Sequence, residues 1–131
     1  MERQHIETVL VEYLGDRPDV AAAYLYGSVA TGAARPDSDV DVGILYRTTP
    51  PPTLLGQPYG DEAELSARVG RPVQIVVMNT APVDLVHRIL RDGALIVERD
   101  ASARIAFEVR SRNQYYDLLP VLLEYRKRAT V

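Results

Sequence analysis

Two apolar runs separated by a short polar stretch constrain this chain more than any other feature. The run VAAAYLY ends in Gly27 and Ser28, and the run VDVGILY starts directly after Asp39 with a second aspartate, Asp41, inside it. Apolar runs of this length, bounded by turn residues, predict buried β-strands. Aspartate is depleted from strands, and a charge is costly to remove from water. The two carboxylates therefore need a compensating interaction.

The remainder of the chain alternates expected helices with expected strands. Helices are predicted at 2–14, around 28–32, at 61–70, at 82–91 and from 102 onward; strands are predicted at 20–26, 40–46, 72–78 and 94–98. The proline-rich connection after the second strand is expected to lack regular structure, and Pro120 is expected to break or kink the last helix. This order predicts one α/β (α+β) domain over 1–131, with a small mixed or largely parallel sheet flanked by helices.

Composition and charge exclude several classes of protein. The 131 residues are 47% hydrophobic and 25% charged, which is enough to build a core, and the absence of cysteine excludes disulfides and thiolate metal sites. The net charge of −3 argues against general nucleic-acid binding, so no direct nucleic-acid contact is expected. No apolar run approaches the roughly 20 residues that span a membrane, and no signal peptide is evident. We therefore expect a cytoplasmic protein with no membrane contact.

The polar residues around the two strands form a candidate site. Side chains alternate along a strand, so Asp39 and Asp41 are expected on one face, where they repel each other unless a cation lies between them. Magnesium binds through one or two carboxylates together with substrate phosphates. Gly27 permits a tight turn that a ligand can approach closely, and Ser28 offers a hydroxyl and free backbone N–H groups. This combination suits metal-assisted nucleotidyl transfer.

Each part of this pattern also has an ordinary explanation. A Gly-Ser pair after a strand is commonly a plain turn, and a lone Asp-x-Asp is commonly an exposed strand edge. The joint arrangement favours the functional interpretation: Gly-Ser, ten residues, and then Asp-x-Asp leading into an apolar strand.

The same residues resemble the signature of a known superfamily. Its matching positions here are Gly27, Ser28, Gly32, Ser38, Asp39, Asp41 and Leu45. They resemble the DNA polymerase β-like nucleotidyltransferases, and the length resembles the minimal nucleotidyltransferase (MNT) branch. The segment NTAPVDLVHRILRDGALIVERDASARIAFEVRSRNQYYDLLPVL is similar to the C-terminal half of the antitoxins that pair with HEPN-domain ribonuclease toxins.

The resemblance implies roles for residues of this chain. Gly27 and Ser28 would hold the triphosphate of ATP, and Asp39 and Asp41 would bind Mg²⁺. A third carboxylate, expected on the strand PVQIVVM, would complete the second metal site and help deprotonate the acceptor hydroxyl. Gln74 stands at that position. An amide carries no charge and cannot act as a base at neutral pH, so the metal at the acceptor would be weakened.

Three functions remain open on this basis. The first is an antitoxin that uses Mg-ATP to adenylylate a tyrosine of a HEPN toxin. The second is a catalytically impaired antitoxin of the same fold that binds and occludes the toxin, and the residue at position 74 separates these two. The third, a nucleotidyltransferase acting on a small molecule, is disfavoured by the short chain. A stripe on the last helix is expected to face the core, although this helix could also dock the partner; the stripe consists of Ile105, Val109, Tyr116, Leu119 and Leu123.

Overall fold

The strand β1 (Val20–Tyr26) lies in the interior of the sheet, and all seven of its residues are buried. In the computed structural model, which describes residues 2–35 and 37–129, the strand order is β3-β2-β1-β4. The strands β2 (Val40–Tyr46) and β4 (Ala94–Glu98) flank β1 and run antiparallel to it, whereas β3 (Val73–Val77) is parallel to β2. The expected mixed sheet is thus confirmed.

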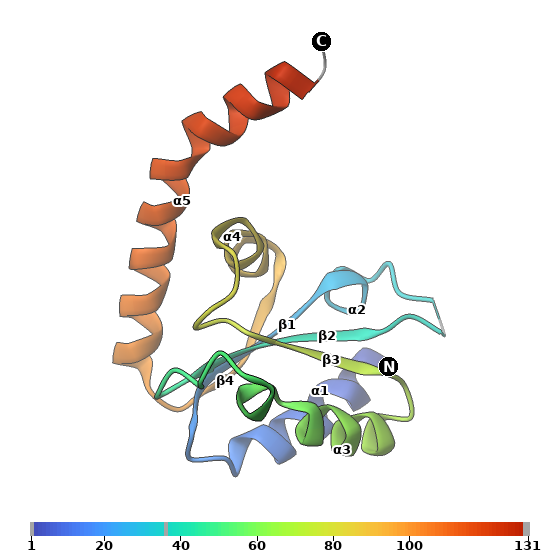
Figure 1. The fold of residues 1–131 in the computed structure, drawn as a ribbon. Helices are drawn as coiled ribbons and strands as arrows, with labels where there is room; N and C mark the ends of the chain where they lie inside the picture. The colour runs from blue at the N-terminus through green and yellow to red at the C-terminus, as the bar shows by residue number, and fades with distance from the viewer. Residues whose placement is uncertain (1, 36, 130–131) are drawn as a thin grey trace.

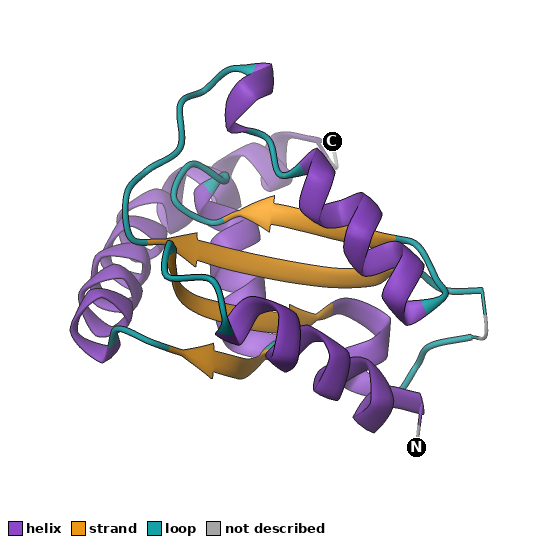
Figure 2. Cartoon of the chain, turned by 90° about the horizontal axis from the view of Figure 1, so that it is seen from below, coloured by secondary structure: helices purple, strands orange, loops and turns teal. Residues whose placement is uncertain are grey.

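Helices cover both faces of this sheet (Figures 1 and 2). One face carries α1 (Glu2–Gly15) and α3 (Tyr59–Val69), and the other carries α4 (Val83–Asp92) and the first part of α5 (Ala101–Ala129). Two short helical segments connect the strands: α2 (Gly27–Thr31) follows β1 directly, and a 3-10 turn (Leu54–Gly56) interrupts the proline-rich connection. The fold is that of the expected α/β (α+β) class.

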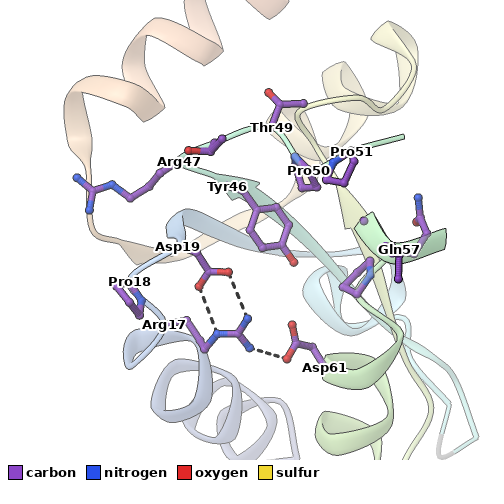
Figure 3. Close-up of a pocket in the computed structure, with 14 residues that line it drawn as sticks. Arg17, Pro18, Asp19, Tyr46, Arg47, Thr49, Pro50, Pro51, Gln57 and Asp61 are labelled. Carbon is purple, nitrogen blue, oxygen red and sulfur yellow. Dashed lines mark hydrogen bonds and ion pairs between the residues drawn. The ribbon is translucent and has the colours of Figure 1, made fainter. Parts of the chain in front are cut away.

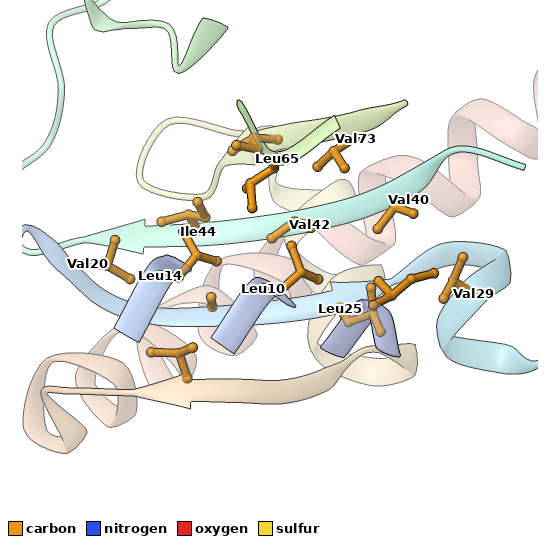
Figure 4. Close-up of a cluster of buried hydrophobic side chains, with 14 residues drawn as sticks. Leu10, Leu14, Val20, Leu25, Val29, Val40, Val42, Ile44, Leu65 and Val73 are labelled. Carbon is orange, nitrogen blue, oxygen red and sulfur yellow. The ribbon is translucent and has the colours of Figure 1, made fainter. Parts of the chain in front are cut away.

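The alternation of side chains along β2 fixes which face each residue meets. Val40, Val42 and Ile44 are fully buried on the α1/α3 side, where Leu10 and Leu65 pack against them (Figure 4). Asp41 lies between the first two of these valines in sequence, so its carboxylate is directed to the opposite face. The burial of the valines therefore fixes the direction of the aspartate.

Most of the predicted boundaries hold to within two residues. The strands at 20–26, 40–46 and 94–98 are confirmed, and β3 is shorter by one residue at each end than expected. The helix α3 begins two residues before the predicted position and ends, as expected, at Gly70, which has a left-handed φ of 81°. The short 3-10 turn is the one regular piece in a connection that was expected to be irregular.

The last helix departs most from expectation. Pro120 does not end α5, which continues to Ala129 and bends in its outer part (Figure 1). Of the expected core-facing stripe, Ile105, Val109 and Tyr116 are about half exposed or more, so that expectation was wrong. The inner part of α5 meets the core through a different face, which carries Phe107 and Ser111, and its outer part extends beyond the sheet (Figure 1). Within the described residues, no helix is both long enough and apolar enough to cross a membrane.

A buried arginine holds the loop that leads into β2. Arg71, which is 9% exposed, precedes β3, and its guanidinium donates to the carbonyl oxygens of Ser38 and Arg35 at 2.6–3.0 Å. It also donates to the Glu2 carboxylate at 2.5 Å. Because Ser38 precedes Asp39, this buried cation fixes the backbone from which the first candidate carboxylate projects.

We expect Arg71→Ala to lower the free energy of unfolding by about 2–4 kcal/mol, because the substitution leaves carbonyl groups and the Glu2 charge without their donor. Urea denaturation measures the change. The control is Arg68→Ala, which removes an exposed arginine that pairs with Glu64 and should cost at most about 1 kcal/mol. Equal losses in the two variants would contradict a structural role for the Arg71 contacts.

Candidate active site

The sheet brings three of the predicted site residues together. In the β2 register, Asp41 lies opposite Tyr26 of β1 on one side and Gln74 of β3 on the other. Asp39 precedes β2 and is exposed, whereas Asp41 is partly buried. The Gln74 amide donates a hydrogen bond from Nε2 to Oδ2 of Asp39 at 2.9 Å. The position expected to carry a third acid therefore contacts the first aspartate.

The turn at Gly27 lies directly against Asp41. Gly27 has a φ of +75°, and a Cβ atom built there would lie 2.3 Å from Oδ2 of Asp41. The left-handed backbone favours glycine here, and a Cβ would force the Asp41 carboxylate to move. Ser28 follows in the first turn of α2, and no side chain caps the first backbone N–H groups of this helix. The glycine corner and the Asp41 carboxylate are thus neighbours.

A cavity of about 270 Å³ opens beside this corner. Its lining residues come from β1, α2, β2 and α4; they are Tyr26, Gly27, Thr31, Asp41, Arg88 and Asp92. Arg88 and Asp92 lie one turn apart on α4 and were not identified from the sequence. Because α4 packs on the sheet through Val86 and Ile89, Arg88 and Asp92 lie beside residues that are far from them in the sequence. The only sequence signal was their i, i+4 spacing on the polar side of this helix.

The charges in the site are only partly compensated. Burial raises the pKa of Asp41 above its ordinary value, the neighbouring charge of Asp39 raises it further, and Arg88 opposes both effects. Burial, followed by the Asp41 charge, raises the pKa of Tyr26 to about 12, so this phenol stays protonated at neutral pH. An additional cation between the two aspartates would stabilise the ionised form of Asp41.

The donor set fits one magnesium ion better than two. Asp39 and Asp41 supply two carboxylates, and Gln74 has an amide oxygen within the same group. Mg²⁺ is commonly bound in this way when substrate phosphates complete its shell. No group of three histidine, cysteine or acidic side chains that could hold a metal exists among residues 2–35 and 37–129. A second metal would therefore lack a charged protein ligand of its own.

Other acids do not take the place of the missing carboxylate. Asp61 accepts hydrogen bonds from Tyr13 at 2.6 Å and from Arg17 at 2.5 Å, and Glu62 accepts one from the Ile75 backbone at 2.8 Å. Both lie on α3, which covers the opposite face of the sheet. Asp92 lines the cavity beside Asp41. The hydrogen bonds that Arg91 donates to it lower its pKa, so it is a poor base.

A larger cavity of about 750 Å³ lies at the other end of β2 (Figure 3). Three of its charged residues are paired with each other: Arg17 bonds to Asp19 at 3.2 Å and to Asp61 at 2.5 Å. The fourth, Arg47, pairs with Asp100 outside the cavity at 3.8 Å. Tyr46 reaches into it from the end of β2, far along the strand from Asp41. Its size exceeds that of the cavity at Gly27, but each of its charged groups already has an ionic partner, and it lacks the Asp-x-Asp pair.

We expect Asp41→Asn to raise the melting temperature of the metal-free protein by about 2 °C. The pKa of Asp41 is higher in the folded chain than in the unfolded chain, so its contribution to stability is complete below the ordinary carboxyl pKa. That contribution is lost as the pH rises through the folded value. At neutral pH the ionised carboxylate therefore destabilises the fold.

Thermal unfolding at several pH values tests this expectation. The gain from Asp41→Asn should be largest at neutral pH and should vanish near pH 3, where both proteins are uncharged at this position. Asp37→Asn, which alters an exposed acid in the preceding loop, is the control and should change the melting temperature little. A lower melting temperature for Asp41→Asn at pH 7 would show that its carboxylate is already well compensated.

Three solved structures share this fold over nearly the whole chain. A toxin–antitoxin complex with AMP-PNP matches with a TM-score of 0.82 and 19% identity, covering 95% of this chain and 98% of that chain. A complex of tri-AMPylated Shewanella oneidensis HEPN toxin with MNT antitoxin matches with a TM-score of 0.78 and 18% identity, covering 98% and 99%. A MntA–HepT toxin–antitoxin complex matches with a TM-score of 0.72 and 16% identity, covering 99% and 97%. At these identities the likeness concerns the fold.

The sequence itself gives the family. No curated protein matches the chain. The model of the family described as "Polymerase beta, Nucleotidyltransferase" matches residues 8–102, which include the glycine corner, both aspartates and Gln74. Because this match covers more than half of the chain, the protein belongs to the polymerase β nucleotidyltransferase family.

Proposed function

We propose that this protein is an antitoxin that neutralises a HEPN-domain ribonuclease toxin by transferring AMP from Mg-ATP to a tyrosine of the toxin. The observation that carries the proposal is the placement of Asp41 against the Gly27 corner, with Asp39 two residues before it and bonded to Gln74, in a chain of the nucleotidyltransferase family. The similar folds of a toxin–antitoxin complex with AMP-PNP and of a complex containing an AMPylated HEPN toxin support it.

The openness of the site favours a macromolecular acceptor. Asp39 and Gln74 are exposed, and the cavity of about 270 Å³ beside Asp41 is smaller than most small-molecule sites. A small acceptor would need a pocket that buries most of its surface, whereas a protein brings its own surface to the site. A small-molecule acceptor such as an aminoglycoside is for this reason less well supported.

The proposed reaction is an in-line displacement. The phenol oxygen of the toxin tyrosine attacks the α-phosphorus of ATP, the bond from that phosphorus to the bridging oxygen breaks, pyrophosphate leaves, and the phenol proton passes to solvent. Magnesium held by Asp39 and Asp41 would neutralise phosphate charge as it develops. Gly27 lets the triphosphate approach the backbone, and the first N–H groups of α2 donate to it. Gln74 lies where the acceptor would enter but cannot accept its proton.

The hydrogen bond between Gln74 and Asp39 favours a second function, binding without modification. The amide satisfies one oxygen of Asp39 and adds no negative charge, so the site is stable without a second metal. Such a protein would neutralise the toxin by covering its active site and would still bind nucleotide. Both functions require a stable complex with the toxin, which would bury at least about 1,000 Å².

Incubation of the toxin with Mg-ATP and antitoxin, followed by separation of the two proteins, distinguishes these functions. For the wild type we expect the toxin to gain the mass of one or more AMP groups and to stay inactive in RNA cleavage after separation. The Asp39→Ala/Asp41→Ala variant should bind and inhibit the toxin but leave its mass unchanged, with full recovery of cleavage on separation. Recovery of unmodified, active toxin after incubation with the wild type would favour occlusion.

A carboxylate at position 74 should increase transfer. We expect Gln74→Asp or Gln74→Glu to add a ligand for the second metal and to raise the rate of AMP incorporation by about 10²-fold or more. Without metal, the added charge beside Asp39 should lower the melting temperature, and Mg²⁺ should restore it. Gln74→Asn is the uncharged control and should gain no rate. If neither acid variant is faster, the base lies elsewhere or the toxin supplies it.

A further inference from the structure

The cavity beside Gly27 contains one cation whose role the proposed reaction does not yet use. Arg88 projects from α4 into this cavity, opposite Asp41 of β2 and beside the glycine corner. Its guanidinium takes part in no hydrogen bond or ion pair within 4.0 Å of any other described residue. The other arginine of this helix, Arg91, is engaged by Asp92 at 2.8–2.9 Å. Arg88 therefore lines the cavity with its donors unused by neighbouring side chains.

We infer that Arg88 binds the β- or γ-phosphate of the nucleotide and stabilises the pyrophosphate as it leaves. The inference deepens the proposed function and rests on it. Arginine presents a planar fork of donors that matches phosphate oxygens, and hydrogen bonds between charged groups of this kind are among the strongest in proteins. The cavity wall formed by Gly27 allows phosphates to approach within reach of this fork.

The sheet register assigns Arg88 to the side of the leaving group. Asp41 lies between Tyr26 of β1 and Gln74 of β3. Gly27, the start of α2 and Arg88 all lie on the β1 side. Gln74, which the resemblance to the nucleotidyltransferases places beside the acceptor hydroxyl, lies on the β3 side. An in-line displacement places the attacking oxygen and the leaving oxygen on opposite sides of the phosphorus. If the acceptor oxygen attacks from the β3 side, pyrophosphate therefore leaves on the opposite side, toward β1 and Arg88.

A simpler role for Arg88 would be that of a counter-ion for the aspartates. Its charge does lower the pKa of Asp41 and of Asp92. A dedicated counter-ion would, however, be expected to bond to one of these carboxylates, as Arg71 bonds to Glu2 and Arg17 to Asp61. When Mg²⁺ neutralises Asp39 and Asp41, the electrostatic attraction of Arg88 to them weakens, and its donors can then bind phosphate.

Nucleotide binding by the free protein tests this role without need of the toxin. We would measure the dissociation constants of AMP, ADP and AMP-PNP by calorimetry with Mg²⁺, for the wild type, Arg88→Gln, Arg88→Lys and the control Arg112→Gln. Arg112 is an exposed arginine on α5, outside the cavity. We expect Arg88→Gln to weaken AMP-PNP about 10- to 100-fold and AMP less than about twofold. The affinity of Arg88→Lys for AMP-PNP should lie between those of the wild type and Arg88→Gln, and the affinity of Arg112→Gln should match that of the wild type.

The outcomes separate this inference from the proposed function. Equal affinities of the wild type and Arg88→Gln for AMP-PNP would overturn the phosphate role of Arg88 and leave the proposed function standing. Equal losses for all three nucleotides would also overturn it, because a counter-ion acts through the aspartates whatever the number of phosphates. No nucleotide binding by the wild type would overturn the proposed transfer and this inference together. Melting temperatures of the nucleotide-free proteins check that each variant is folded.

Discussion

The close contact between Gly27 and Asp41 is the constraint on which the rest of the site depends. The antiparallel pairing of β1 and β2 sets Tyr26 opposite Asp41, so the chain must turn directly above a carboxylate. Glycine is favoured there because the backbone is left-handed, with a φ of +75°, and because a Cβ would lie 2.3 Å from the carboxylate oxygen of Asp41 and displace it. This contact places the first N–H groups of α2 and the aspartates at one corner of the sheet. Donors for an anion and ligands for a cation thus become neighbours without any loop spanning the distance.

The parts of this arrangement that depend on local pattern were predictable from the sequence. The two-residue period of β2 placed both aspartates on one face, and the glycine between a strand and a polar stretch indicated a tight turn. Gln74 was expected on the strand beside the two aspartates because neighbouring apolar strands of one sheet tend to pair, and the parallel register sets it opposite Asp41. Arg88 could not be identified in this way, because its position depends on how α4 packs over the sheet. The exposed stripe of α5 was misjudged for a similar reason: periodicity identifies a face but not what covers it.

Two arginines outside the sequence signature lie near the site and differ in how their donors are used. Arg71 is buried, and its donors are used by the carbonyls of Arg35 and Ser38 and by Glu2, which fixes the loop before Asp39. Arg88 is exposed to the cavity and keeps its donors unused by neighbouring side chains. Burying a cation is costly unless it is fully hydrogen-bonded, so Arg71 is suited to structure. A cation in a solvated cavity costs little to retain, so Arg88 is suited to a ligand that comes and goes.

The residue at position 74 affects two properties of the site in opposite directions: an amide favours the stability of the empty site, whereas a carboxylate would favour binding of a second metal. A carboxylate there would place a third negative charge beside Asp39 and Asp41, and the ionisation of Asp41 is already opposed by burial and by Asp39. Glutamine instead donates to Asp39 and holds its side chain in place before any metal arrives. In the proposed function, this arrangement would suit a single magnesium ion that binds together with the nucleotide. If the proposed transfer occurs, activation of the acceptor hydroxyl is the step that this chain supports least, because the amide of Gln74 cannot act as a base.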